Sequence, residues 1–254
     1  MMQTHSREIR KIAHCVLAFL AVGASLAFGA EPLSVALVGD GYGKYEVNAI
    51  AKNVLNELDD ICSYQVVEGR LGPEEFGQYD VVVLARTVES YGPGESREIE
   101  KYVTSGGTLV LIGVSPRSLF IVDVGPNDGA VRMRNDSFLF GSTVFEEGGK
   151  EASVFQPDSP LLKDVFAHGS DPLWMMGTVF LPNPDWENII GHNQNILVGR
   201  TSLGKGSVYF FGSELFRLIK AANDAGRPED VQGWIQILKN LFRQAALSPH
   251  HSNP

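Results

Sequence analysis

Short, continuous apolar runs constrain the fold of this chain more than any other feature of its sequence. Leu33–Val38, Asp80–Ala85 and Leu109–Val114 consist largely of branched aliphatic residues and alanine. A run of this length without polar alternation is typical of a strand that is buried on both faces, as in a parallel sheet. Cys62–Val67 predicts a further strand between the first two runs.

Segments with helical spacing alternate with these runs. Apolar residues recur on one face of about Tyr45–Leu58 and of Glu95–Thr104, and the second segment stops at Gly106-Gly107, a common helix terminator. Pro228–Leu247 carries the same amphipathic pattern. The alternation predicts an α/β fold with a doubly wound, mainly parallel, flavodoxin-like sheet and helices on both faces.

The C-terminal third predicts an antiparallel excursion from that sheet. Ile189–Arg200 and Ser207–Gly212 are apolar runs joined by a glycine-containing turn, which indicates a hairpin. Residues from about 118 to 185 are rich in Gly, Asp, Asn and Ser around short apolar pieces. We therefore expect one domain over 31–248, with a loop-rich insertion of short strands at about 118–185.

The first 30 residues are typical of a secretory signal peptide. Three basic residues precede an apolar stretch, and small residues follow it near Ala30. The stretch is shorter than the roughly 20 residues that span a bilayer, and no second one appears later in the sequence. We expect the protein to be exported to the periplasm or secreted, without a membrane span after cleavage.

The net charge of the chain restricts the classes of molecule that it is expected to bind. The formal net charge is −9, and removing the signal segment, which carries +2, leaves −11. This acidity argues against nucleic acid as a partner and leaves a small molecule or another protein. Cys62 is the one cysteine after the signal segment, and we expect it to be a small apolar residue of a buried strand. No Cys and His cluster has metal-ligand spacing, so the sequence predicts neither metal nor cofactor.

A serine stands where the run Leu109–Val114 ends. The sequence there is Gly113-Val114-Ser115-Pro116-Arg117. Ligands and catalytic groups collect at the carboxyl ends of parallel strands, and a nucleophile on a strand-to-helix turn would lie there. Ser115 is therefore a candidate nucleophile, or alternatively a residue that caps a helix or turn.

A glycine-rich segment follows the first strand. Gly39-Asp40-Gly41-Tyr42-Gly43 resembles a dinucleotide-binding turn, but Lys44 occupies the position of the third glycine. We therefore expect no nicotinamide cofactor. The segment predicts instead a loop at the carboxyl edge that contacts a ligand through Asp40, Tyr42 or Lys44.

Other residues could take part in chemistry or binding. His168 and His192 are the histidines available as a base for Ser115, although the sequence places neither beside it. Trp174 and Trp186 could form an aromatic platform for a sugar or, as the alternative, anchor the core and loops. The acids Asp123, Asp128 and Asp136 fit no calcium-loop spacing and read as solvated turn residues.

Three stretches resemble a known group of proteins. They are Tyr79–Ala85, Glu98–Gly113 and Gly204–Glu214, together with the late helix around Trp234 and Asn240. They are similar to the class I glutamine amidotransferase-like fold, and above all to its non-amidotransferase branches, the trehalose-utilisation-type proteins and the central domain of some β-galactosidases. The resemblance covers most of the chain outside about 118–185 and implies the fold more specifically than any activity.

The chain departs from that family at the residues that carry its chemistry. Family amidotransferases have Gly-x-Cys-x-Gly at the nucleophile turn, where this chain has Ser115 and then Arg117 in place of the second glycine. The family's base lies in a His-x-Glu pattern, where this chain has Gly212 and then Glu214. A serine without a base is a poor nucleophile at neutral pH, so amidotransferase activity is not expected.

The sequence thus predicts a non-catalytic, exported amidotransferase-like domain. Its expected cleft contains Ser115, Arg117 and Glu214 as a polar floor, and binds a small ligand, such as a carbohydrate, or a protein partner. Arg117 and Glu214 could instead be a structural ion pair. One alternative is a hydrolase that uses Ser115 with an unconventional base, in which Ser115 and Glu214 are the catalytic candidates. Another is a purely structural module of the cell envelope.

Overall fold

The structure is a computed structural model that describes thirteen stretches of the chain. They are residues 32–39, 55–68, 70–85, 91, 93–113, 142–144, 150–151, 153–166, 174–175, 179–181, 185–192, 195–212 and 223–247. All of them except Pro32 belong to one compact unit, Leu33–Pro254. Of the segment expected to be a helix over about Tyr45–Leu58, only the end from Leu55 is described, and it forms a short 3₁₀ turn, η1 (Asn56–Leu58).

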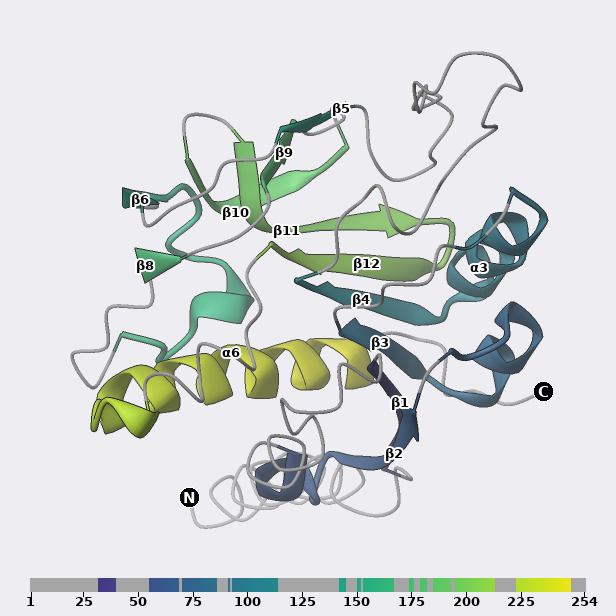
Figure 1. The fold of residues 1–254 in the computed structure, drawn as a ribbon, viewed down its shortest axis with the longest axis horizontal. Coiled ribbons are helices and arrows are strands. Elements are labelled where there is room, and N and C mark those ends of the chain that lie inside the picture. Colours follow the sequence, from purple (N-terminus) through teal and green to yellow (C-terminus); the bar gives the residue numbers. More distant parts are fainter. Residues whose placement is uncertain are drawn as a thin grey trace, which may run out of the picture. The chain divides into compact units, whose positions relative to one another are not determined.

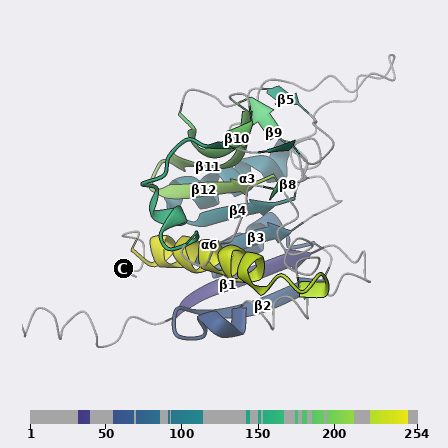
Figure 2. The ribbon, with the colours of Figure 1, turned by 90° about the vertical axis from the view of Figure 1, so that its left-hand side faces the viewer.

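Ten strands of the described chain form one mixed sheet (Figures 1 and 2). Its parallel half has the order β2-β1-β3-β4-β12, and its antiparallel half continues with β11, β10 and β7, while β9 joins β11 and β5 joins β9. The parallel strands are β1 (Leu33–Gly39), β2 (Cys62–Glu68), β3 (Val81–Ala85), β4 (Thr108–Ile112) and β12 (Gly206–Phe211). The others are β5 (Ser142–Val144), β7 (Ser153–Val154), β9 (Val179–Leu181), β10 (Glu187–His192) and β11 (Asn195–Leu203).

The predicted α/β class is confirmed, and the sheet is more mixed than expected. The parallel half arises from the apolar runs that predicted it, and the turn at Gly204-Lys205 joins β11 to β12 as an antiparallel hairpin. The prediction of a single strand over Ile189–Arg200 is wrong, because β10 and β11 pair with each other and place His192 opposite Asn195. β10 and β11 are both apolar, so the hydrophobic pattern does not show that the chain reverses direction between them.

Short strands also come from the region expected to be an insertion. β5, β7 and β9 lie there, as do β6 (Lys150–Glu151) and β8 (Trp174–Met175), which pair with each other as a separate two-stranded sheet. The same region contains a single 3₁₀ turn, η3 (Pro160–Leu162). The domain limits themselves stay a prediction.

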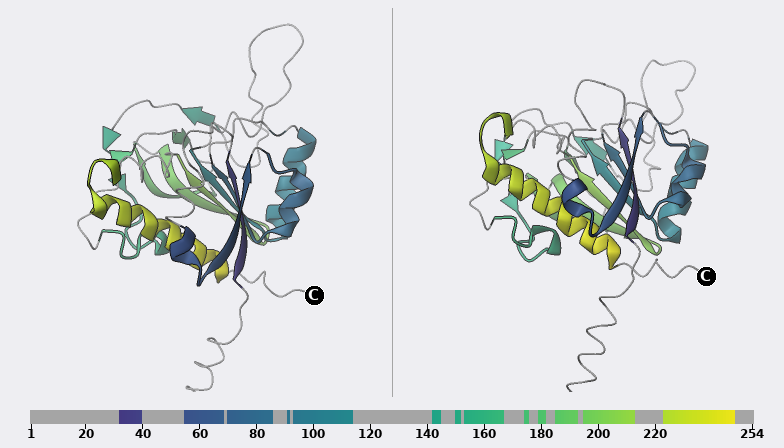
Figure 3. Two further views of the ribbon diagram at one scale, coloured as in Figure 1. Left: turned by 60° about the horizontal axis from the view of Figure 1, so that its bottom comes forward. Right: turned by 90° about the horizontal axis from the view of Figure 1, so that it is seen from below.

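Helices cover both faces of the sheet (Figure 3). α6 (Pro228–Ala246) packs its apolar face, including Trp234 and Leu241, against the side chains of one sheet face. α3 (Pro93–Ser105) packs Ile99 and Val103 against the other face, beside the 3₁₀ turn η2 (Pro73–Gln78). Because both faces are buried, every residue of β3 and β4 is buried, which is why these strands read as unbroken apolar runs.

A close backbone crossing sets the position of β12 beside β4. A Cβ atom on Gly206 would lie 2.1 Å from the carbonyl oxygen of Val103 and 2.3 Å from that of Gly107. The Lys205 N–H donates a hydrogen bond to the Thr104 carbonyl at 3.0 Å, so the hairpin turn rests on the end of α3. Only glycine allows β12 to begin this close to the turn between α3 and β4.

Asn240 fastens α6 to η3. Its side-chain amide donates hydrogen bonds to the carbonyl oxygens of Leu161 at 3.0 Å and Lys163 at 2.7 Å. The amide of Gln236 donates to the Asn240 side-chain oxygen at 2.9 Å. Asn240 is buried, so these bonds satisfy polar groups that would otherwise lie unpaired inside the protein.

Cys62 behaves as the sequence predicted. It is a free cysteine at the start of β2, with 3% of its surface exposed. Burial, with smaller contributions from the nearby carboxylates of Asp60 and Asp59, raises the pKa of its thiol from 9.0 to about 11. The thiol is therefore neutral and unreactive at neutral pH.

Replacing Gly206 with alanine should destabilise the fold by at least about 2 kcal/mol, because the added methyl group forces backbone apart at the β4–β12 junction. Urea denaturation followed by circular dichroism measures the change. Gly77→Ala is the matched control, since a Cβ there meets nothing within 4 Å, and it should leave the free energy of unfolding within about 1 kcal/mol. Equal urea midpoints for the two variants would contradict the close backbone contact at Gly206.

Cys62 should make the stability fall at alkaline pH. Its pKa is raised in the folded state, so the stabilisation is complete below about pH 9 and is lost as the pH rises toward 11. We expect Cys62→Ala to show a smaller decrease in urea midpoint between pH 8.5 and 10.5 than the parent protein. Iodoacetamide at pH 8 should modify Cys62 only in urea, as read by peptide mass spectrometry; rapid modification of the folded protein would refute its burial.

Candidate functional site

The five parallel strands end at one edge of the sheet, where the sequence places the cleft. Gly39 of β1 is in register with Ala85 of β3, Ala85 with Ile112 of β4, and Ile112 with Phe211 of β12. The chain therefore leaves β1, β4 and β12 at the same carboxyl edge. Asp40, Ser115 and Glu214 follow these strand ends within three residues.

Two glycines lie side by side at the centre of this edge. Gly113 has a φ of 59°, and its N–H donates a hydrogen bond to the Phe211 carbonyl at 2.8 Å. Gly212 is buried, and its N–H donates to the Leu197 carbonyl at 2.8 Å. The family resemblance puts a histidine at Gly212. The position that would supply a base lies beside the end of β4, but it has no side chain.

The side chains that the sequence predicts for the cleft lie outside the described residues. These are Asp40, Tyr42, Lys44, Ser115, Arg117 and Glu214, and their roles stay predictions. His168 is also outside the described part. The backbone of His192 lies at the carboxyl edge, but β12 and β11 separate β10 from β4, which places it roughly 14 Å from the end of β4 at ~4.8 Å per strand.

Trp186 belongs to the core, as the alternative reading of the sequence held. It is 8% exposed and packs with the apolar residues on the α3 side of the sheet. It therefore offers no platform for a sugar. Trp174 lies in β8, a two-residue strand.

A charged group on the sheet was not found from the sequence. Glu187, Arg200 and Tyr209 lie opposite one another on β10, β11 and β12, and Arg200 forms an ion pair with Glu187. Burial lowers the pKa of Arg200, but Glu187 and Tyr209 outweigh it and raise the pKa above its usual value. Burial raises the pKa of Tyr209, against the opposing effect of Arg200. The Glu187–Arg200 pair links the two arms of the β10–β11 hairpin, and no spacing in the sequence marks it.

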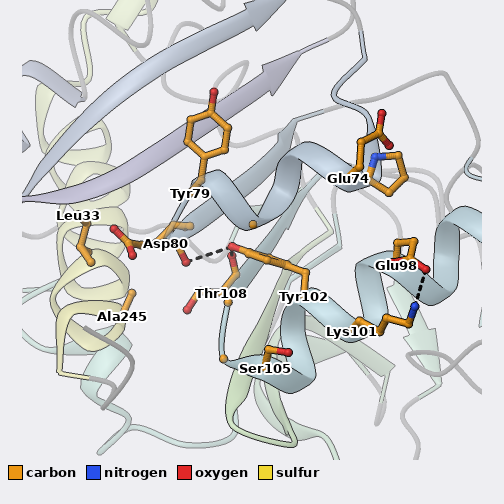
Figure 4. Close-up of a pocket in the computed structure, with 15 residues that line it drawn as sticks. Leu33, Glu74, Tyr79, Asp80, Glu98, Lys101, Tyr102, Ser105, Thr108 and Ala245 are labelled. Carbon is orange, nitrogen blue, oxygen red and sulfur yellow. Dashed lines mark hydrogen bonds and ion pairs between the residues drawn. The ribbon is translucent and has the colours of Figure 1, made fainter. Parts of the chain in front are cut away.

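The described residues form a pocket at the opposite, amino edge of the sheet (Figure 4). We call it the amino-edge pocket. Its volume is about 430 Å³. It is lined by Leu33, Pro73, Glu74, Gly77, Tyr79, Asp80, Val81, Glu98, Lys101, Tyr102, Ser105, Gly106, Gly107, Thr108 and Ala245. The starts of β1, β3 and β4 thus meet the end of α3, the turn η2 and the last turn of α6 there.

Hydrogen bonds fix the middle of the amino-edge pocket. The Tyr102 hydroxyl lies between the carbonyl oxygens of Asp80 at 3.1 Å and Thr108 at 3.0 Å (Figure 4). Ser34 donates to one carboxylate oxygen of Asp80 through its N–H at 2.7 Å and its hydroxyl at 2.8 Å. Burial, reinforced by the charge of Asp80, raises the pKa of Tyr102 far above its usual value, so the phenol stays neutral.

Beyond an acid at the start of an apolar run, no pattern in the sequence marks this pocket. Asp80 begins the apolar run Asp80–Ala85, and Tyr102 lies within the expected helix over Glu95–Thr104. Their meeting with Thr108 depends on three segments that are distant in sequence and joined only by the sheet. Within the described ranges, no three His, Cys, Asp or Glu side chains gather where they could hold a metal ion. None of the helices described is both long and apolar enough to cross a membrane.

Comparisons with known proteins show what the fold resembles. No protein-family model matches the chain, and no curated protein matches it. The cytoplasmic protein STM1381 from Salmonella typhimurium LT2 aligns over 84% of this chain and 99% of its own, with a TM-score of 0.51 and 14% identity. The N-terminal domain of mmIFT52 aligns over 85% of this chain and 99% of its own, with a TM-score of 0.50 and 13% identity.

A ThuA-like protein from Parabacteroides merdae is also similar, at 14% identity and a TM-score of 0.47, over 88% of this chain and 93% of its own. Identities this low show a shared fold alone. The α/β fold that the class I glutamine amidotransferase-like resemblance implied is therefore supported, and membership of that family stays a prediction.

Proposed function

We propose that this protein is an exported, non-catalytic amidotransferase-like domain that binds a small ligand, such as a carbohydrate, or a protein partner. The observation that carries this proposal is the buried Gly212 beside the end of β4. The family resemblance assigns the base to this position, and glycine has no group that accepts a proton. The hydroxyl of Ser115 would then stay protonated and react poorly.

The carboxyl edge is the proposed binding site. In open α/β sheets, ligands bind in the crevice outside the carboxyl ends of the strands. The chain segments that carry Asp40, Ser115 and Glu214 leave the sheet at this edge. We propose Ser115, Arg117 and Glu214 as the polar floor of the cleft, with Asp40, Tyr42 and Lys44 at its side.

A Ser115-dependent hydrolase is the second candidate function. The φ of 59° at Gly113 favours it, because a left-handed residue directly after β4 begins the kind of sharp turn that exposes a nucleophile. The base would have to be unconventional, since Gly212 supplies none and the His192 backbone lies three strands from β4.

The binding proposal predicts that a carbohydrate panel contains a ligand that raises the melting temperature. Replacing Ser115, Arg117 and Glu214 together (S115A, R117A, E214Q) should abolish the shift, because it removes the polar floor. The matched control changes Ser63, Arg97 and Glu100 in the same way, and these residues lie on β2 and α3 away from the carboxyl edge. Thermal-shift assays followed by calorimetric titration make the comparison. A ligand that binds both triple variants equally would refute the proposed cleft.

The same proteins separate binding from hydrolysis. A fluorophosphonate probe should leave the parent protein unlabelled if Ser115 lacks a base. Labelling that disappears in Ser115→Ala would overturn the non-catalytic proposal in favour of the hydrolase.

Export predicts a processed N-terminus. Expression of the full chain in a bacterium should yield a periplasmic or secreted form that begins within a residue or two of Glu31, because the segment before it is typical of a cleaved signal peptide. Cell fractionation and N-terminal sequencing test this. An unprocessed chain in the cytosolic fraction would contradict it.

A further inference from the structure

The amino-edge pocket is a second site, distinct from the carboxyl-edge cleft of the proposed function. Its volume of about 430 Å³ lies within the range of ~300–1,000 Å³ typical of small-molecule sites. Figure 4 shows the hydroxyl of Tyr102 at its centre between Asp80 and Thr108, with Leu33 and Ala245 on one side and Glu98 and Lys101 on the other.

The backbone donors around this pocket are already used. The N–H of Asp80 donates to the Ser34 carbonyl at 2.9 Å, and that of Thr108 to the Asp80 carbonyl at 3.0 Å. The N–H groups of Gly106 and Gly107 donate to Val103 and Tyr102 carbonyls at 2.8 and 3.0 Å. The hydroxyl proton of Tyr102 is directed to backbone carbonyls. A ligand therefore meets few free donors here.

The Thr108 hydroxyl is one polar group of the lining that remains available. Thr108 is 3% exposed and lines the amino-edge pocket at the start of β4. None of the hydrogen bonds found among the described residues uses its Oγ1 atom. Oγ1 is open to the pocket, because the fully buried side-chain atoms that lack a partner in the described chain are Ser159 Oγ and Asn188 Oδ1. The hydroxyl is therefore available to a ligand in the pocket.

The charge of the lining selects the kind of ligand. Glu74, Asp80 and Glu98 are negative and Lys101 is positive, which leaves a net charge of −2. Lys101 is occupied by Glu98, whose carboxylate accepts its hydrogen bond at 2.6 Å. A pocket with acidic walls and a net negative charge repels anions and favours a ligand that donates hydrogen bonds and carries positive charge.

We propose that the amino-edge pocket binds a small organic cation with a primary ammonium group. The ammonium donates a hydrogen bond to Oγ1 of Thr108, and Asp80 supplies the counter-charge beside it. Glu74 attracts the cation at the mouth of the pocket. Gly77 carries no side chain, and a Cβ there would meet nothing within 4 Å, which leaves room for the aliphatic part of the ligand.

The test compares three five-carbon probes on the full-length protein at low salt. Calorimetric titration should detect binding of 1,5-diaminopentane, but not of 1,5-pentanediol, which lacks the charge, or glutarate, which has the opposite charge. Binding should weaken as salt is added, because surface carboxylates contribute to it. No heat from the diamine, or equal binding of the diol, would overturn the proposal.

Two variants locate the bound cation. Thr108→Val keeps the size of the side chain and removes Oγ1, so it should weaken diamine binding by about three- to tenfold, the worth of one hydrogen bond. Its melting temperature should be unchanged or higher, because the hydroxyl has no partner in the free protein. A Thr108→Val variant that folds and binds the diamine with unchanged affinity would refute the role of Thr108.

Glu74→Gln and Glu75→Gln form a matched pair on the same turn. Each removes one negative charge, but Glu74 lines the pocket, whereas the Glu75 carboxylate accepts a hydrogen bond from the Gly72 N–H at 2.9 Å. Only Glu74→Gln should weaken diamine binding, by about two- to fivefold. Equal weakening in both would mean that general surface charge, and not this pocket, attracts the diamine. The triple variant at the carboxyl edge should bind the diamine normally, which separates this proposal from the proposed function.

Discussion

The structure depends most on the parallel pairing of β4 with β12 in the middle of the sheet. This pair joins the four parallel strands that come early in the chain, β1 to β4, to β12 and the antiparallel strands, which come later. It requires the β11–β12 hairpin to lie directly on the turn between α3 and β4, where Gly206 touches backbone carbonyls. The same pair places Gly113 beside Gly212 at the carboxyl edge and Thr108 at the amino edge. Both candidate sites are therefore consequences of one junction.

The two edges of the sheet differ in what the sequence reveals about them. At the carboxyl edge, single positions carry the signal, because the family resemblance puts a base at Gly212 and a thiol at Ser115. At the amino edge, the signal arises only in three dimensions. In the sequence, Asp80 and Thr108 are residues at the starts of strands and Tyr102 is a residue of a helix. In the structure, the Tyr102 hydroxyl donates hydrogen bonds to the backbone carbonyls of the other two.

The fold was predictable wherever burial alone determines which positions of a strand or helix are apolar. β3 and β4 lie between two helical layers, so they read as unbroken apolar runs, and α6 reads as an amphipathic helix with one buried face. The reversal between His192 and Asn195 was missed, because the hydrophobic pattern is the same in one long strand and in two paired ones. The Glu187–Arg200 pair was missed for a related reason, since strand register decides which polar residues meet.

The chain order of the β4–β12 junction has a consequence for biogenesis. β4 ends at Ile112 and its partner begins at Gly206, so most of the chain must be made before the centre of the sheet can close. Until then, β4 is an apolar strand with one unpaired side, the kind of surface on which other chains assemble. Because such distant pairings form slowly, a chain that crosses a membrane before folding would need protection of this side during its passage.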